Sequence, residues 1–96
     1  MNQYFVAQIK INDPIEYGKY LDKFDEIFSR YKGVYLAIDE SPAILEGQWD
    51  YTKSVLVKFA SKKDFEDWYY SDDYQKILKY RLSSSRCDTI LIEGVD

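Results

Sequence analysis

Residues 65–81 read FEDWYYSDDYQKILKYR and predict a helix in two pieces that is rich in aromatic side chains. Ser61 is a good N-cap for a first piece that starts at Lys62, and Ser71 is a good N-cap for the second. The side chains that share one face at helical spacing are Phe65, Trp68 and Tyr69 in the first piece, and Tyr74, Ile77, Leu78 and Arg81 in the second. A helix this aromatic needs an apolar surface to pack on.

Four other segments are predicted to be strands: residues 4–11, whose residues alternate between an apolar and a mixed face, and residues 34–38, 54–59 and 88–95. After the first strand, a helix is predicted to begin at Pro14 with Asp13 as its cap. It is predicted to end at residues 32–33, with Gly33 in the left-handed conformation. Residues 39–53 form a long connection in which 43–46 are a candidate edge strand, and residues 83–86 are predicted to be a loop.

The order βαββαβ predicts an α+β fold of the ferredoxin-like type, with a four-stranded antiparallel sheet and both helices on one face. We expect residues 1–96 to form a single domain. The second face of the sheet is then bare and is expected to carry Tyr4, Val6, Leu56 and Leu91. An exposed apolar face on so small a domain predicts a partner, and the economical partner is a second copy related by a two-fold axis.

The composition excludes several kinds of site. The chain has no histidine, which removes histidine-based catalytic triads, histidine-ligated haem and the usual zinc sites. The net charge of −4, without a long basic run, argues against nucleic acid and anionic membranes as partners. Cys87 is the only cysteine, so no intrachain disulfide can form and a cytoplasmic location is expected. We expect neither a metal nor a cofactor.

Four motifs resemble the domain-of-unknown-function 1330 (DUF1330) family, which belongs to the dimeric α+β barrel superfamily. They are Asp13-Pro14-x-x-Tyr17-x-x-Tyr20, Leu45-Glu46-Gly47-x-Trp49, Trp68-Tyr69-x-Ser71-x-x-Tyr74-Gln75 followed by Arg81, and Asp88-x-x-x-x-Glu93-Gly94. The resemblance implies a homodimer whose two sheets close into a barrel, with a cavity on the sheet face away from the helices. It brings no assigned reaction, because the family has none. Family members often carry an Arg-Gly-Gly-like turn after the second strand, where this chain has Ile38-Asp39-Glu40, so anion binding by that segment is not expected.

Six residues are candidates for a ligand site: Gln8, Trp49, Lys58, Tyr74, Arg81 and Glu93. Arg81 would either bind a ligand carboxylate or have a structural role, as an ion pair with Asp88 or Glu93 or as a cation at a helix C-terminus, and the structural role is the favoured interpretation. If Glu93, Lys58 and Gln8 all face the barrel, burial would raise the pKa of Glu93 toward the acid/base range. The favoured interpretation leaves these residues near strand ends, in solvent or paired with each other.

Two of the candidates are aromatic. Trp49, in the long connection, either plugs the dimer interface or gates the cavity. Tyr74 is a candidate hydrogen-bond donor to a ligand, although packing is the commoner role in a chain with ten tyrosines. Trp68 is expected to be a core residue. Residues 72–73 are adjacent carboxylates that helix capping explains, so no metal site is predicted.

These features lead us to expect a homodimer that binds a small apolar or aromatic molecule in a cavity on the sheet face. The alternative is a cofactor-independent monooxygenase or isomerase that uses carboxylate acid/base chemistry, with Glu93 as a weak candidate catalytic residue. A structural or regulatory dimer with a filled barrel is a third hypothesis. The sequence alone leaves open whether the chain is an enzyme.

Overall fold

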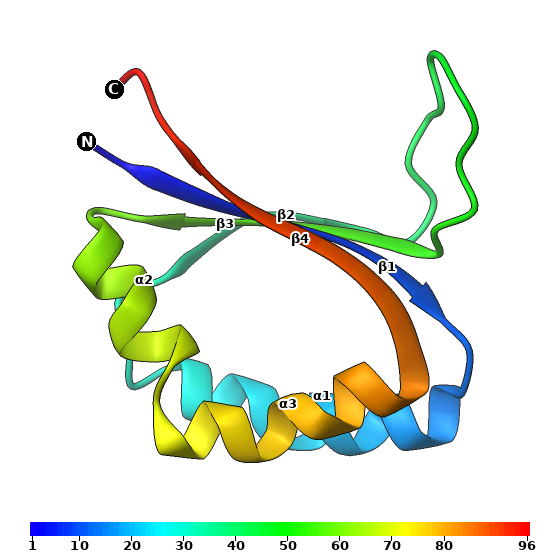
Figure 1. Ribbon diagram of the computed structural model, residues 1–96, viewed down its shortest axis with the longest axis horizontal. Coiled ribbons are helices and arrows are strands. Elements are labelled where there is room, and N and C mark those ends of the chain that lie inside the picture. The colour runs from blue at the N-terminus through cyan, green and yellow to red at the C-terminus, as the bar shows by residue number, and fades with distance from the viewer.

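In the computed structural model, which describes all of residues 1–96, strands and helices follow the predicted order, with the second helix divided in two (Figure 1). The elements are β1 (Gln3–Ile11), α1 (Pro14–Phe28), β2 (Val34–Asp39), β3 (Lys53–Phe59), α2 (Lys62–Tyr69), α3 (Asp72–Ser84) and β4 (Ser85–Glu93). The strands form one sheet in the order β2-β3-β1-β4, and each neighbouring pair is antiparallel. α1 and α3 lie side by side beneath one face of this sheet. The predicted α+β, ferredoxin-like fold class is confirmed.

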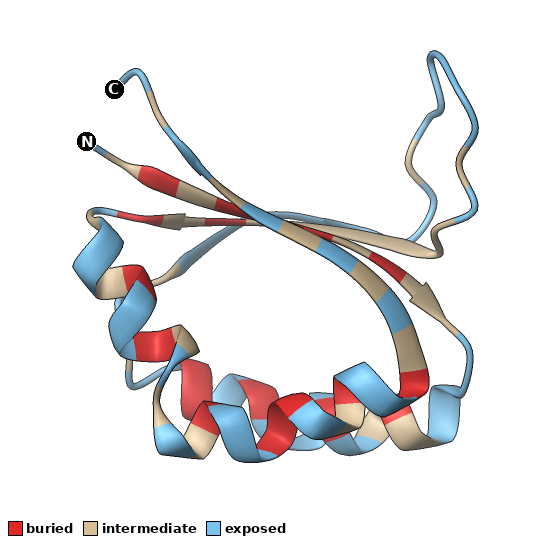
Figure 2. Cartoon of the chain, in the orientation of Figure 1, coloured by how far each residue is buried: buried red, intermediate tan, exposed pale blue.

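The core lies between the helices and the sheet, where the buried residues of both layers face one another (Figure 2). Trp68 of α2 is at its centre and is only 1% exposed. Its ring stacks on Phe59 with centroids 5.6 Å apart and meets Phe28 edge-on at 5.3 Å. Burying a large aromatic side chain contributes about 1.5–3 kcal/mol, so rings of this kind stabilise the helix–sheet interface strongly. The prediction that Trp68 is a core residue is confirmed.

Two serines fix where the aromatic helix starts and where it breaks. The Ser61 hydroxyl accepts a hydrogen bond from the backbone N–H of Asp64 at 3.1 Å, which caps α2. The Ser71 hydroxyl accepts from the N–H of Tyr74 at 3.2 Å and donates to the carbonyl of Trp68 at 2.7 Å. The Ser71 side chain therefore pairs with a backbone carbonyl at the end of α2 and with a backbone N–H at the start of α3. Both predicted caps are confirmed.

The end of α1 differs from the prediction. The helix ends at Phe28 rather than at residues 32–33, and Gly33 does not have a positive φ. A Cβ atom at Gly33 would clash with the rings of Phe28 and Phe59. Glycine at position 33 thus allows the backbone to approach the aromatic core closely, and its conformational freedom is not what the fold requires.

Residues 83–86, expected to be a loop, are instead the direct junction of α3 and β4. The helix runs to Ser84 and the strand begins at Ser85. The Ser84 hydroxyl donates to the carbonyl of Tyr80 at 2.6 Å, while the Ser84 carbonyl accepts from the N–H groups of Asn12 at 2.8 Å and Asp13 at 3.0 Å. The Ser84 hydroxyl satisfies a carbonyl group of the last helical turn, and the N–H groups of Asn12 and Asp13 satisfy another, so the helix passes into the strand without an intervening loop.

The sheet has one face free of helices, which we call the open face. It carries Tyr4, Val6, Gln8, Lys10, Ser54, Leu56, Lys58, Arg86, Asp88, Ile90 and Ile92. Leu91 pairs with Phe5 on the helix-covered face, so the expectation that Leu91 lies on the open face is wrong. Ile90 and Ile92 lie there in its place, 58% and 48% exposed. The open face is therefore apolar near its centre, as expected, although one of its residues was misassigned.

The connection from residue 40 to residue 52 projects beyond the sheet as an extended loop (Figure 1). Residues 43–46, the candidate edge strand, form no strand. The loop returns to the sheet through an ion pair between Asp50 and Arg86 at 2.6 Å and a hydrogen bond from the Tyr51 hydroxyl to Asp88. Its base is therefore fixed to β4, while its tip has no such tether.

The two ends of the chain lie together at the opposite side of the sheet (Figure 1). The N–H of Gly94 donates to the carbonyl of Asn2 at 2.7 Å, and the Tyr4 hydroxyl donates to Asp96 at 2.7 Å. These bonds extend the pairing of β1 with β4 to the last residues of the chain.

Candidate functional site

A cavity of about 40 Å³ lies between the sheet and the helices. Fourteen residues line it, from β1, β2, β3 and all three helices, and twelve of them are hydrophobic. The two exceptions, Lys53 and Arg81, are both cationic, and no carboxylate contributes to the wall. This cavity is on the helix-covered face, opposite to the face on which the resemblance implied one.

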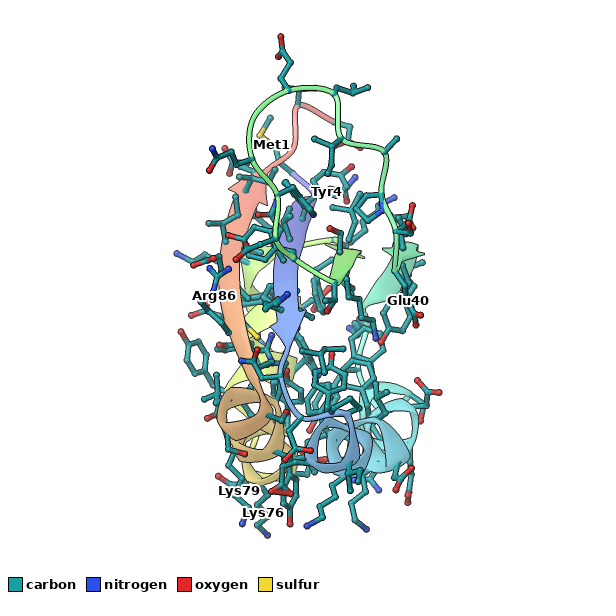
Figure 3. The ribbon with its side chains drawn as sticks, turned by 90° about the vertical axis from the view of Figure 1, so that its right-hand side faces the viewer. Met1, Tyr4, Glu40, Lys76, Lys79 and Arg86 are labelled. Atoms are coloured by element: carbon teal, nitrogen blue, oxygen red, sulfur yellow. The ribbon has the colours of Figure 1, made fainter.

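Arg81 reaches the cavity because it shares the buried stripe of α3 with Tyr74, Ile77 and Leu78. Figure 3 shows the polar side of the same helix, where Lys76 and Lys79 point away from the sheet. Arg81 is only 2% exposed, and its Nε atom has no hydrogen-bond partner. The last turn of an amphipathic helix thus holds a cation inside the core.

The predicted ion pair of Arg81 with Asp88 or Glu93 does not form. Asp88 lies on the open face, where it bonds to Arg86 at 3.3 Å. Glu93 accepts a hydrogen bond from the Gln3 side chain at 3.4 Å. The ion-pair form of the structural interpretation is therefore wrong, because the sheet separates Arg81 from one carboxylate and the length of β4 separates it from the other. Arg81 does lie in the last turn of α3, as the other structural interpretation, a cation at a helix C-terminus, predicted.

Three tyrosines surround this arginine. The hydroxyl groups of Tyr20 and Tyr74 are hydrogen bonded at 2.8 Å, and the guanidinium carbon of Arg81 lies 5.8 Å from the centre of the Tyr20 ring. Burial raises the pKa of Tyr17 to about 12, against the opposing effect of Arg81, and burial also raises the pKa of Tyr20 and Tyr74. At neutral pH these phenols are uncharged hydrogen-bonding groups and not bases.

The charge of Arg81 itself is retained. Burial alone acts to lower the pKa of its guanidinium, but the neighbouring Tyr74 and Tyr20 hydroxyls outweigh it and hold the pKa above the usual value. Arginine is in any case protonated across the accessible pH range. The interior of the cavity therefore carries a permanent positive charge.

Lys53 is a cavity residue that the sequence analysis missed. It opens β3 opposite Ile9, and its ammonium nitrogen lies 5.4 Å from the centre of the Tyr17 ring. Burial lowers its pKa, against the opposing charges of Glu40 and Asp25. The signal was present in the sequence, because Lys53 is in phase with the apolar positions 55, 57 and 59 of the same strand.

Gln8, Lys58 and Glu93 do not share one face, so the hypothesis that they line one pocket together is wrong. Gln8 and Lys58 lie on the open face, paired with Ser54 and Tyr4 respectively. Glu93 pairs with Gln3, which is buried on the other face, because odd-numbered residues of β4 oppose odd-numbered residues of β1. These three residues therefore cannot form one acid/base site within a single chain.

Trp49 lies away from the cavity, in the projecting loop. Its ring meets Tyr51 edge-on at 5.0 Å, and its indole Nε1 is buried without a hydrogen-bond partner. Together with residues 42–46 it lines a surface hollow of about 320 Å³. Of the six candidates named from the sequence, the structure brings only Arg81 and Tyr74 together.

No group of three or more aspartate, glutamate or cysteine side chains is placed to hold a metal ion. None of the helices combines the length and apolar character that crossing a membrane requires.

A family model described as a domain of unknown function (DUF1330) matches residues 2–95 of the chain. No curated protein matches it in sequence.

Solved structures with the same fold are similar over nearly the whole chain. RPA0582, a protein of unknown function from Rhodopseudomonas palustris, has a TM-score of 0.83 at 13% identity, covering 99% of this chain and 83% of its own. A dimeric ferredoxin-like protein of unknown function from Jannaschia sp. CCS1 has a TM-score of 0.73 at 12% identity, covering 98% and 100%. SnoaB, a cofactor-independent oxygenase from Streptomyces nogalater, has a TM-score of 0.70 at 12% identity, covering 99% and 94%. At these identities the likeness shows the fold.

Proposed function

This chain belongs to the DUF1330 family, a domain family of unknown function, and from that premise we propose that it is a homodimer that binds a small, mostly apolar or aromatic molecule between its sheet and its helices. The observation that carries the proposal is the cavity itself. Its wall is hydrophobic at twelve of fourteen positions and offers a few convergent polar groups, namely Arg81, Lys53 and the tyrosine hydroxyls. An apolar enclosure with few orienting groups is the usual character of a small-molecule site.

The open face supports the homodimer. Val34, which pairs with Lys58, is about half exposed on this face, as are Ile90 and Ile92, and a domain of 96 residues gains stability by covering such a surface. Solved structures with this fold include proteins described as dimeric and ferredoxin-like. A second copy facing the first sheet would cover both open faces at once.

Ligand binding is tested with a pair of matched variants. Ala7 is 2% exposed in the cavity wall, so Ala7→Val narrows the cavity, whereas Ala60→Val adds the same two methyl groups at an exposed position. We expect ethanol, propanol or butanol to raise the melting temperature of the native protein and of Ala60→Val, but not of Ala7→Val. If none of these probes shifts the melting temperature or the backbone NMR signals of β1 and α1, the proposal fails.

A second candidate is a cofactor-independent oxygenase, and the structural likeness to SnoaB favours it. Such a reaction needs a group that removes a proton from the substrate. No carboxylate lines the cavity, so Glu93 has no access to a ligand there, and Lys53 with its lowered pKa is the remaining base. Oxygen uptake in the presence of hydroquinone, lost in Lys53→Met, would support this candidate, and absence of uptake by the native protein would remove it.

A further inference from the structure

The guanidinium of Arg81 is buried without an anionic partner. Arg81 is 2% exposed, its Nε atom is unpaired, and the ion pairs of the chain all involve other cations. A buried charge that is neither paired nor fully hydrogen bonded is strongly unfavourable. The ring of Tyr20, 5.8 Å away, offsets only part of that cost. An anion bound beside Arg81 would offset the rest.

The surroundings of Arg81 do not supply this anion. The groups that act on its pKa are the phenols of Tyr74, Tyr20 and Tyr69 and the thiol of Cys87, and none of them is a carboxylate. The other charged residue in the cavity wall, Lys53, is also a cation. A chain with a net charge of −4 therefore encloses a cavity whose only charges are positive.

The tyrosine pair adds a hydrogen-bond donor. The Tyr20 and Tyr74 hydroxyl groups share one hydrogen bond at 2.8 Å, in which one O–H donates and the other accepts. The accepting hydroxyl keeps its own proton, which has no acceptor on the protein. A carboxylate that accepts from Arg81 and from this O–H would satisfy both groups, and bonds of this kind to a charged acceptor are about twice as strong as neutral ones.

The size of the cavity limits the remainder of the ligand. A cavity of about 150 Å³ holds a benzene ring, whereas this one measures about 40 Å³. The rest of the wall is apolar, which disfavours a sulfate or phosphate dianion that needs hydrogen bonds on every side. We infer that the ligand is a short-chain monocarboxylate of about two or three carbon atoms, with its carboxylate on Arg81 and its alkyl chain against the apolar wall. This inference rests on the proposed function of the same cavity.

The experiment compares propionate with propionamide, an uncharged analogue of the same shape, and with benzoate, a bulky carboxylate. Isothermal titration calorimetry measures each against the native protein. We expect propionate to bind at least tenfold more tightly than either of the others. Arg81→Met removes the charge and keeps an unbranched apolar side chain, so it is expected to weaken propionate binding at least tenfold and to leave propionamide binding unchanged. Arg30→Met, at an exposed arginine, is the control and is expected to change neither.

Each other outcome decides a different point. Equal binding of propionate and propionamide overturns the carboxylate inference but leaves the apolar site in place. Benzoate binding more tightly than propionate overturns the limit on size. Absence of binding by these compounds and by the neutral probes named above overturns both the inference and the proposed function. If Arg81→Met does not fold, the NMR shift of the Arg81 Nε–H signal in the native protein during titration with propionate gives the same decision.

Discussion

The hydroxyl oxygens of Tyr20 and Tyr74 lie 2.8 Å apart and join α1 to α3 inside the core. Replacing either tyrosine by phenylalanine leaves the other hydroxyl buried without its partner, so we expect each single variant to lose about 1–2 kcal/mol of unfolding free energy. The double variant should lose less than the sum of the two, because no hydroxyl is then left unpaired. Urea unfolding measures all three, with Tyr70→Phe, at a tyrosine that is 65% exposed, as the control. Additive losses would show that the bond contributes little.

Two glycines predict opposite effects of the same substitution. A methyl group at Gly33 would clash with the rings of Phe28 and Phe59, and we expect Gly33→Ala to cost about 1–3 kcal/mol. Gly18 lies inside α1 with open space around it, so Gly18→Ala should stabilise the protein by about 0.5–1 kcal/mol. The midpoints of urea unfolding measure both changes. A stable Gly33→Ala variant would show that the aromatic core can move aside.

The open face predicts that assembly depends on Ile90. Lysine at this position would place a charge in the proposed dimer interface, so we expect Ile90→Lys to raise the dimer dissociation constant at least tenfold. Ile15→Lys, at a residue of α1 that is 84% exposed, should leave the constant unchanged. Sedimentation velocity over a concentration series measures both. An unchanged dimer in Ile90→Lys would place the interface elsewhere.

The carboxylate of Asp73 predicts an acid-dependent contribution to stability. Burial acts to raise its pKa, but hydrogen bonds that include those from Tyr31 at 2.8 Å and Arg30 at 2.9 Å outweigh burial and hold the pKa at about 2. Because this folded-state pKa lies below the usual value of 3.8, the contribution is present above pH 3.8 and is lost as the pH falls toward 2. Carbon-13 NMR titration should show the Asp73 pKa rising in Arg30→Met and not in Arg86→Met. An unchanged pKa in Arg30→Met would contradict the assignment.

Local signals made most of the fold predictable from the sequence. The caps at Ser61 and Ser71 depend only on residues within one helical turn, and the phase of β1 follows from its own alternation. The phase of β4 does not follow from its own sequence, because Ile90, Leu91 and Ile92 are all apolar. Only the pairing with β1 decides which of them the helices cover.

The site was less predictable because it depends on which elements meet. The burial of Arg81 followed from its position on the apolar stripe of α3. The lack of a carboxylate partner did not, since it depends on the sheet lying between Arg81 and Asp88. Lys53 was assigned to the long connection, which hid its alternation with the apolar residues of β3.

The bond between Gly94 and Asn2 has a practical consequence for engineering the protein. Because Asn2 and Gly94 are adjacent, a short glycine-rich linker would join residues 1 and 96 without disturbing the sheet. New ends could then be opened near Gly47, at φ 85° in the untethered tip of the loop between β2 and β3. Such a circular permutant would keep every strand pairing while moving the attachment point of a fluorescent label or an immobilising tag to the far side of the molecule.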